Sequence, residues 1–310
     1  MSNRERDFMR SEVTTLENLL SSLPEGRIIE RIGFEERLRQ ARERLAAFEA
    51  GPRAQSLPIT FRGAPVEGAR SIDAGFASIA LRAFIEATDT VAASLTSDGF
   101  KGRGRLPGAS RSLRIVDTAR GSFGFELELP PPVGNTAQMP LEGLGEEPDP
   151  YAAAIATTFK LIADATSSDE EGMSDLIAEI HPRAATKVHA FAKVLSDAGA
   201  GFAAEFEGRR LRLNEGAEVQ RVLDALRDED IAERTEEQNG VLLGILPESR
   251  RFECRVGDGR VISGKVDRAL PDIASFKATW ENKEALLSFR VVSVRANQRF
   301  ILTAAGEPRQ

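Results

Sequence analysis

The C-terminal part of the chain contains short apolar segments that alternate with polar residues and are separated by turn signals. Five such segments lie in residues 239–305, and the dipeptide Asp258-Gly259 between two of them is a strong signal for a β-hairpin. One polar helical excursion, residues 271–283, interrupts the series. Five short strands in this span predict a small β-barrel over residues 236–306.

The N-terminal residues 1–50 have the opposite character, because their apolar residues recur at helical spacing. The first predicted helix ends at the Pro-Glu-Gly sequence of residues 24–26, and the second covers about 28–50. The second helix carries a thin apolar stripe of Ile32, Leu38, Leu45 and Phe48 among many Arg/Glu pairs. Such a helical hairpin needs a partner surface, which is either the rest of the chain or a second copy.

Residues 57–130 are predicted to form an α+β domain of sandwich-like type. It contains a strand at 58–63, a helix with Ser71 as its N-cap, and strands at 112–117 and 122–129. In the last strand Phe123, Phe125, Leu127 and Leu129 alternate with Gly124, Glu126 and Glu128. This period of two predicts one buried face and one wet face.

The sequence Gly121-Ser122-Phe123-Gly124 raises the question of a catalytic or phosphate-binding loop. A nucleophile elbow needs Gly-x-Ser-x-Gly followed by a helix, and a phosphate loop needs a helix N-terminus. Here a strand follows, so the glycines indicate a bend or a bulge between strands. We expect Ser122 not to be a nucleophile.

The remaining segments complete an α+β chain. Residues 131–150 form a Pro/Gly linker, and residues 151–235 form a mostly helical α+β segment. The acidic run at 224–237 lacks the spacing of a calcium loop and is interpreted as a solvated helix end and linker. The predicted architecture is an N-terminal helical hairpin, the sandwich-like domain, the helical segment and a small C-terminal barrel of OB-like or SH3-like type.

The basic stretch at 99–114 is the sharpest candidate for a binding site. It contains no acidic residue and five cations: Lys101, Arg103, Arg105, Arg111 and Arg114. Such a glycine-containing loop can follow a phosphate backbone or contact an acidic partner. The alternative is a solvated connection between a helix and a strand.

Other constellations are better explained by structure than by chemistry. The spacing Pro271-Asp272…Glu281-Asn282-Lys283 resembles the PD…ExK pattern of metal-dependent nucleases, although no apolar strand leads into it. His181 and His189 have no third ligand nearby, so a helix start and a partly buried helix position explain them. Cys254 lies in a predicted strand and is interpreted as a core thiol. We therefore predict no metal, no cofactor and no catalytic residue.

Bulk composition limits the function classes further. The net charge of −7 gives no global electrostatic reason to expect nucleic-acid binding. The charged N-terminus, the single cysteine and the lack of a long apolar run predict a cytoplasmic chain with no membrane span. Arginine outnumbers lysine 34 to 7, which is typical of a GC-rich bacterial genome.

These observations favour a non-enzymatic bacterial protein that binds other macromolecules or assembles with itself. The first alternative is a nucleic-acid-binding component of a mobile-element or antiviral-defence system, and the second is an unrecognised hydrolase or nuclease. Because a metal site assembled from distant carboxylates leaves no local sequence signal, the enzyme question stays open.

Overall fold

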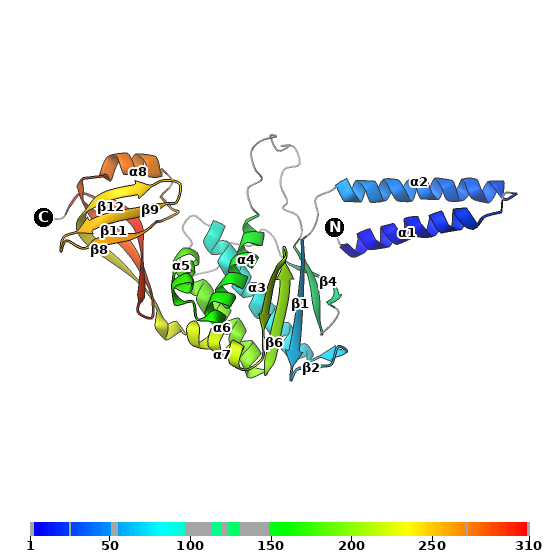
Figure 1. Ribbon diagram of the computed structural model, residues 1–310, viewed down its shortest axis with the longest axis horizontal. Helices are drawn as coiled ribbons and strands as arrows, with labels where there is room; N and C mark the ends of the chain where they lie inside the picture. The colour runs from blue at the N-terminus through cyan, green and yellow to red at the C-terminus, as the bar shows by residue number, and fades with distance from the viewer. Residues whose placement is uncertain are drawn as a thin grey trace. The chain divides into compact units, whose positions relative to one another are not determined.

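The computed structural model describes residues 3–24, 26–50, 55–96, 113–119, 123–129, 149–270 and 272–308. It confirms a mixed α+β chain with a closed five-stranded barrel at its C-terminal end (Figure 1). The described helices are α1 (Asn3–Ser22), α2 (Ile28–Ala50), α3 (Ala74–Thr96), α4 (Pro150–Ser167), α5 (Glu170–Ile180), α6 (Pro182–Asp197), α7 (Ala217–Ala225) and α8 (Ile273–Trp280).

The strands form three sheets in the part of the chain that is described. The sheet of order β4-β5-β1-β6-β7 contains β4 (Arg114–Ala119), β5 (Phe123–Leu129), β1 (Gln55–Gly63), β6 (Ala200–Phe206) and β7 (Arg209–Leu213). A short ribbon contains β2 (Val66–Glu67) and β3 (Ser71–Ile72). The barrel contains β8 (Ile231–Leu246), β9 (Arg251–Val256), β10 (Val261–Val266), β11 (Glu284–Val294) and β12 (Asn297–Gly306).

The chain divides into two compact units. One holds residues 1–60, 110–147 and 203–210, and the other holds residues 61–109, 148–202 and 211–310. The predicted domain boundaries remain predictions.

In the first unit, α1 and α2 form the predicted hairpin. Its small core consists of Leu16, Leu38 and Ala41. Ion pairs join the two helices on the outside, from Arg10 to Glu49 at 2.6 Å and from Arg42 to Glu17 at 2.7 Å. Since exposed ion pairs each contribute little, the narrow apolar seam accounts for most of the pairing.

The close packing of β5 against β1 explains the second glycine of the Gly-Ser-Phe-Gly sequence, Gly124. A Cβ atom on Gly124 would lie 2.0 Å from the carbonyl oxygen of Ile59 on β1, so only glycine allows this close approach of the two backbones. Residues 120–122, and with them Ser122, lie outside the described residues.

In β5, Leu127 and Leu129 are buried as expected, but Glu128 is buried as well. The prediction of a wet face is therefore wrong at this end of β5, where both faces are covered.

In the second unit, the helix α3 begins two residues later than a Ser71 cap requires. Ser71 pairs with Glu67 in the ribbon of β2 and β3, and the carboxylate of Asp73 accepts a hydrogen bond from the Phe76 N–H at 2.7 Å. The predicted N-cap was therefore wrong, and Asp73 has that role. The apolar face of α3 is buried, and its Phe84 packs against Phe191 of α6 and Phe202 of β6 with ring centroids 5.4–5.6 Å apart.

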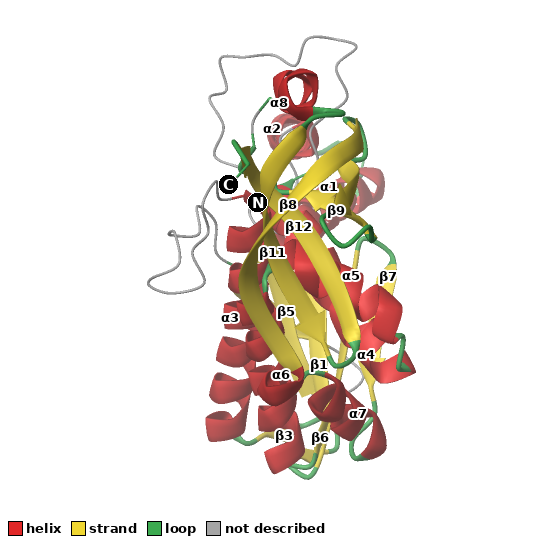
Figure 2. Ribbon diagram, turned by 90° about the vertical axis from the view of Figure 1, so that its left-hand side faces the viewer, coloured by secondary structure: helices red, strands yellow, loops and turns green. Residues whose placement is uncertain are grey.

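The barrel closes in the order β10-β12-β11-β8-β9, and its strands are strongly curved (Figure 2). The third and fifth strands in chain order, β10 and β12, form a parallel closing pair, and α8 lies between the third and fourth. This arrangement favours the OB fold over an SH3-like barrel. The interior is apolar and includes Leu242, Phe252, Cys254, Phe289, Val291 and Leu302.

The strand β8 corrects the interpretation of the acidic run at 224–237. Residues 231–237 are the first half of β8 and not a linker, because β11 supplies their backbone partners in a ladder that includes Glu233↔Val292 and Glu237↔Ser288. The acidic side chains are tolerated because this half of the strand is exposed or half-buried.

Candidate functional site

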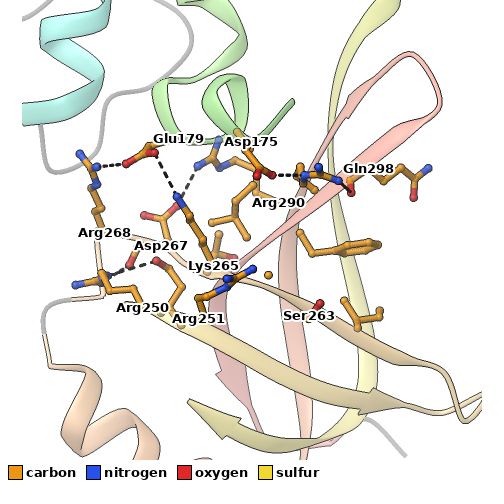
Figure 3. Close-up of a pocket in the computed structure, with 18 of the residues that line it drawn as sticks. Asp175, Glu179, Arg250, Arg251, Ser263, Lys265, Asp267, Arg268, Arg290 and Gln298 are labelled. Atoms are coloured by element: carbon orange, nitrogen blue, oxygen red, sulfur yellow. Dashed lines mark hydrogen bonds and ion pairs between the residues drawn. The ribbon is translucent and has the colours of Figure 1, made fainter. Parts of the chain in front are cut away.

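A cavity of about 1030 Å³ lies within the second unit, between the helix α5 and the outside of the barrel. Three parts of that unit line it: the end of α3, one side of α5 with His181 after it, and the barrel, which contributes residues from all five strands and from the loop before β9. Figure 3 shows charged side chains from α5 facing those of the barrel. It is a concave surface with converging polar groups, so we treat it as the candidate site.

The carboxylates of α5 recur one helical turn apart and contact barrel cations. The carboxylate of Glu179 lies 2.6 Å from Arg268 Nη2 and 3.2 Å from Lys265 Nζ, and Figure 3 shows it between these two side chains. Asp175 forms an ion pair with Arg299 of β12. On the barrel itself, Arg290 of β11 lies 3.4 Å from Asp267.

An apolar contact holds α5 against the barrel beneath these ion pairs. Val291 and Val292 are adjacent in β11, and both are fully buried. Since successive strand residues point to opposite faces, Val291 fills the barrel interior and Val292 points outward. The helix α5 packs on β11 and β12 and buries Met173, Ile177 and Ile180. The cavity wall is therefore fixed by packing, with the charges at its rim.

Two arginines of the cavity have unequal roles. The guanidinium of Arg250 donates to the carbonyl oxygens of Asp267 at 2.5 Å and Leu270 at 2.8 Å, so it fixes the chain that follows β10. In Arg290, Nη1 is buried and has no hydrogen-bond partner among the described residues. A buried donor without an acceptor is costly, which makes this group a point where a ligand oxygen would be favourable.

His181 stands at the edge of the cavity and links three elements. Its Nδ1 accepts a hydrogen bond from the Arg183 N–H at 3.1 Å and so caps α6, as the predicted helix-start role requires. Its Nε2 lies 3.3 Å from Glu233 Oε2 of β8. Burial lowers the pKa of His181, an effect opposed by Glu233. The imidazole is neutral near pH 7 and acts as a structural connector.

The structure describes only one of the five residues of the predicted basic site. Lys101, Arg103, Arg105 and Arg111 lie outside the described residues. Arg114 is the first residue of β4, is exposed, and stands opposite Glu128 in the ladder with β5.

The other candidate constellations have local structural roles. The carboxylate of Asp272 accepts from the Ser275 N–H at 2.9 Å and caps α8, while Glu281 lies 3.5 Å from Lys277. The Lys283 ammonium donates to the Thr279 carbonyl oxygen at 2.7 Å, so the side chains of the PD…ExK-like spacing do not converge. Pro271 is outside the described residues. Within the described ranges, no group of three or more His, Cys, Asp or Glu side chains is placed to hold a metal ion.

The sequence contains one signal for this site. Glu171, Asp175 and Glu179 recur every four residues, which places one carboxylate per turn on a single side of a helix. That stripe indicates a charged face, but the identity of its partner depends on cations more than eighty residues away, at 265–299.

No protein-family model, curated protein or solved structure matches this chain. Among the described helices, none has both the length and the hydropathy needed to cross a membrane. The OB-type strand order by itself carries no function, because such barrels serve many.

Proposed function

We propose that this chain is a non-enzymatic bacterial protein that binds other macromolecules and assembles with copies of itself through the tip of its helical hairpin. The supporting observation is an apolar patch where α1 ends and α2 begins. We define this tip patch as Leu19, Ile28, Ile29 and Ile32, whose exposed fractions are 42, 64, 88 and 60%. Burying one such side chain contributes about 1.5–3 kcal/mol, so leaving several in water is unfavourable.

A second copy of the chain is the occupant that the charges around the tip favour. Residues 27–37 contain three arginines and three glutamates, so the start of α2 carries both signs of charge. Arg27 and Glu30 already pair at 3.1 Å. Arginines of one tip can therefore face glutamates of the other, and a self-complementary patch of this kind forms a two-fold interface.

The test is the mass of the purified chain by light scattering over a range of concentrations. The double substitution Ile29→Asp and Ile32→Asp should reduce the assembly to the mass of one chain. The matched control is Ile79→Asp, because Ile79 is 57% exposed on α3 and its replacement should leave the mass unchanged. A wild-type chain of 33.7 kDa at every concentration, or a double variant that assembles like the wild type, would contradict the proposal.

The second candidate function is a nucleic-acid-binding component of a mobile-element or antiviral-defence system. The OB-type barrel favours it, since such barrels commonly bind single strands. If the predicted basic stretch contacts phosphates, the logarithm of the binding constant should fall linearly with the logarithm of the salt concentration. The slope should be about −0.9 per phosphate contact on duplex and about −0.7 on single strands. Replacing Arg103, Arg105 and Arg111 by Glu should then abolish binding to all sequences alike.

A further inference from the structure

The barrel is split along part of its closing seam. The parallel ladder between β10 and β12 covers only Gly264–Val266 and Phe300–Leu302. The preceding residues of β10, Val261–Ser263, pair with β9 but with no residue of β12 in the described ladder. In the first half of β10, the edge that faces away from β9 is therefore unpaired by β12.

The register of the β9–β10 hairpin tells which backbone groups lie on this edge. The Val256 N–H donates to the Arg260 carbonyl at 3.0 Å, and the ladder continues through Ile262↔Cys254. Because backbone groups in an antiparallel pair alternate between facing the partner and facing away, Val261 and Ser263 direct their N–H groups away from β9. An unpaired edge of this kind is a template for another strand.

The open edge lines the cavity described above. Val261, Ser263, Gln298 and Arg299 are among its lining residues, so both sides of the split face it. Val261 is 57% exposed although it lies in a strand. Figure 3 shows Ser263 and Gln298 on different strands at the border of this space. A strand entering the cavity would meet the N–H groups of Val261 and Ser263 and an exposed apolar side chain.

Cations outnumber carboxylates by one in the cavity lining, which contains seven Lys or Arg and six Asp or Glu side chains. Asp175, Glu179 and Asp267 each have a cationic partner. Arg251 has no ion pair in the described part of the chain, and Arg250 bonds only carbonyl oxygens. Glu248 has no cationic partner there and Glu233 faces the neutral His181, so these two carboxylates offset part of the positive charge. The guanidinium of Arg251 and the buried Nη1 of Arg290 leave donors that a ligand carboxylate would satisfy.

Aromatic side chains decide between a peptide and a nucleic acid. Single strands of nucleic acid bind to OB barrels largely by stacking their bases on exposed aromatic rings. Among the lining residues, Phe300 is the aromatic one, and its ring packs against the barrel core near Phe289, with centroids 6.0 Å apart. The cavity thus presents strand-pairing groups and cations without a stacking platform.

We propose that the split edge of the barrel binds an extended acidic peptide segment of a partner protein, which pairs with β10 at Val261–Ser263 and places a carboxylate near Arg251. This inference rests on the proposed function, since it names the class of macromolecule that a binding protein of this kind takes. The peptide adds a strand to an open edge, so main-chain hydrogen bonds supply affinity and the cations select acidic side chains.

The experiment measures fluorescence anisotropy of a short labelled peptide of alternating valine and glutamate, titrated with the full-length chain. Two control peptides separate the contributions. One carries lysine in place of glutamate, and the other is N-methylated at alternate amides so that it cannot pair as a strand. We expect the parent peptide to bind and both controls to bind at least about tenfold more weakly.

Variants of the protein test whether the peptide binds at this edge of the barrel. Arg251→Glu should weaken binding about tenfold or more, whereas Arg255→Glu should change it less than about threefold. Arg255 is the matched control because it lies on the same outer face of β9 but does not line the cavity. Ser263→Pro removes one N–H of the open edge and should also abolish binding. If that variant fails to fold, the N-methylated peptide still tests strand pairing.

Four results would overturn the inference: no binding of the parent peptide, equal binding of the N-methylated peptide, equal loss with Arg251→Glu and Arg255→Glu, or tighter binding of a short oligothymidylate than of the parent peptide. The mass measurement on the tip variants is independent of all of these. A chain that assembles through its tip patch but does not bind the peptide contradicts this inference and leaves the proposed function standing.

Discussion

The hydroxyl group of Tyr151 donates a hydrogen bond to the carboxylate of Asp89 at 2.6 Å and so joins α4 to α3. Tyr151 is the single tyrosine of the chain, and it is buried. Burial raises the pKa of Asp89, while the hydrogen bond from Tyr151 opposes that shift. The two helices therefore share a polar contact in which a carboxylate depends on one phenolic donor.

Replacing the donor should destabilise this contact more than neutralising the acceptor. Tyr151→Phe leaves the carboxylate half-buried without this donor, so the free energy of unfolding should fall by about 1–3 kcal/mol. Asp89→Asn keeps an oxygen acceptor and removes the buried charge, so stability should stay the same or rise. Urea denaturation of both variants at neutral pH measures this. A larger loss in Asp89→Asn than in Tyr151→Phe would show that the ionised carboxylate itself is favourable here.

The pKa of His181 predicts a loss of stability in mild acid. Because the folded chain lowers this pKa below the usual 6.5, the unfolded chain takes up a proton first as the pH falls through that value. The free energy of unfolding should therefore decrease below about pH 6.5 and be unaffected by this group above it. The comparison is between the wild type and His181→Asn, which retains a side-chain acceptor for the N-cap.

The variant His181→Asn should have a shallower dependence of unfolding free energy on pH between about 5 and 7 than the wild type. His189→Asn is the matched control, since His189 lies half-buried within α6 and caps no helix. An equally large change of slope in His189→Asn would show that the effect is not specific to His181. Identical profiles for the wild type and His181→Asn would contradict the lowered pKa of His181.

The N-cap of α3 can be assigned by two substitutions. Asp73→Ala removes the acceptor of the Phe76 N–H and should cost about 1 kcal/mol of stability. Ser71→Ala should change stability by less than about 0.5 kcal/mol, because Ser71 is exposed in the β2–β3 ribbon. Thermal unfolding followed by circular dichroism distinguishes the two, and a greater effect at Ser71 would restore the cap that the sequence pattern predicted.

The thiol of Cys254 should be nearly inert in the folded chain. It is fully buried in the barrel core, and burial raises its pKa to about 11. Since the thiolate is the reactive form, alkylation by iodoacetamide at pH 8 should be at least about a hundredfold slower than in urea. Mass spectrometry over time measures the rate. Comparable rates with and without urea would show that the barrel opens on the timescale of labelling.

Much of the fold could be predicted because local patterns report local structure. The hairpin of α1 and α2, the turn near Asp258-Gly259 and the start of α6 at Pro182 depend on residues close in the chain, and the structure confirms them. The first half of β8 could not be predicted in this way. Its acidic residues have no strand pattern of their own and become a strand because β11, more than fifty residues away, supplies backbone partners.

The cavity beside the barrel could not be predicted either, because the residues that line it are far apart in the sequence. The spacing of Asp175 and Glu179 is that of a charged helix face, and nothing nearby in the sequence indicates that Lys265, Arg268 and Arg299 contact it. The open edge at Val261–Ser263 is equally invisible in sequence, because it depends on where the ladder between β10 and β12 stops.

The sequence by itself determined the order and type of most elements, the core character of Cys254 and the α+β class, because side-chain periodicity and turn residues act over a few positions. Only the tertiary structure decided that Asp73 caps α3, that Glu128 is buried, and that α5 covers one side of the barrel. The physical reason is that capping, burial and ion pairing depend on neighbours in space. Those neighbours are set by the closure of sheets between distant segments.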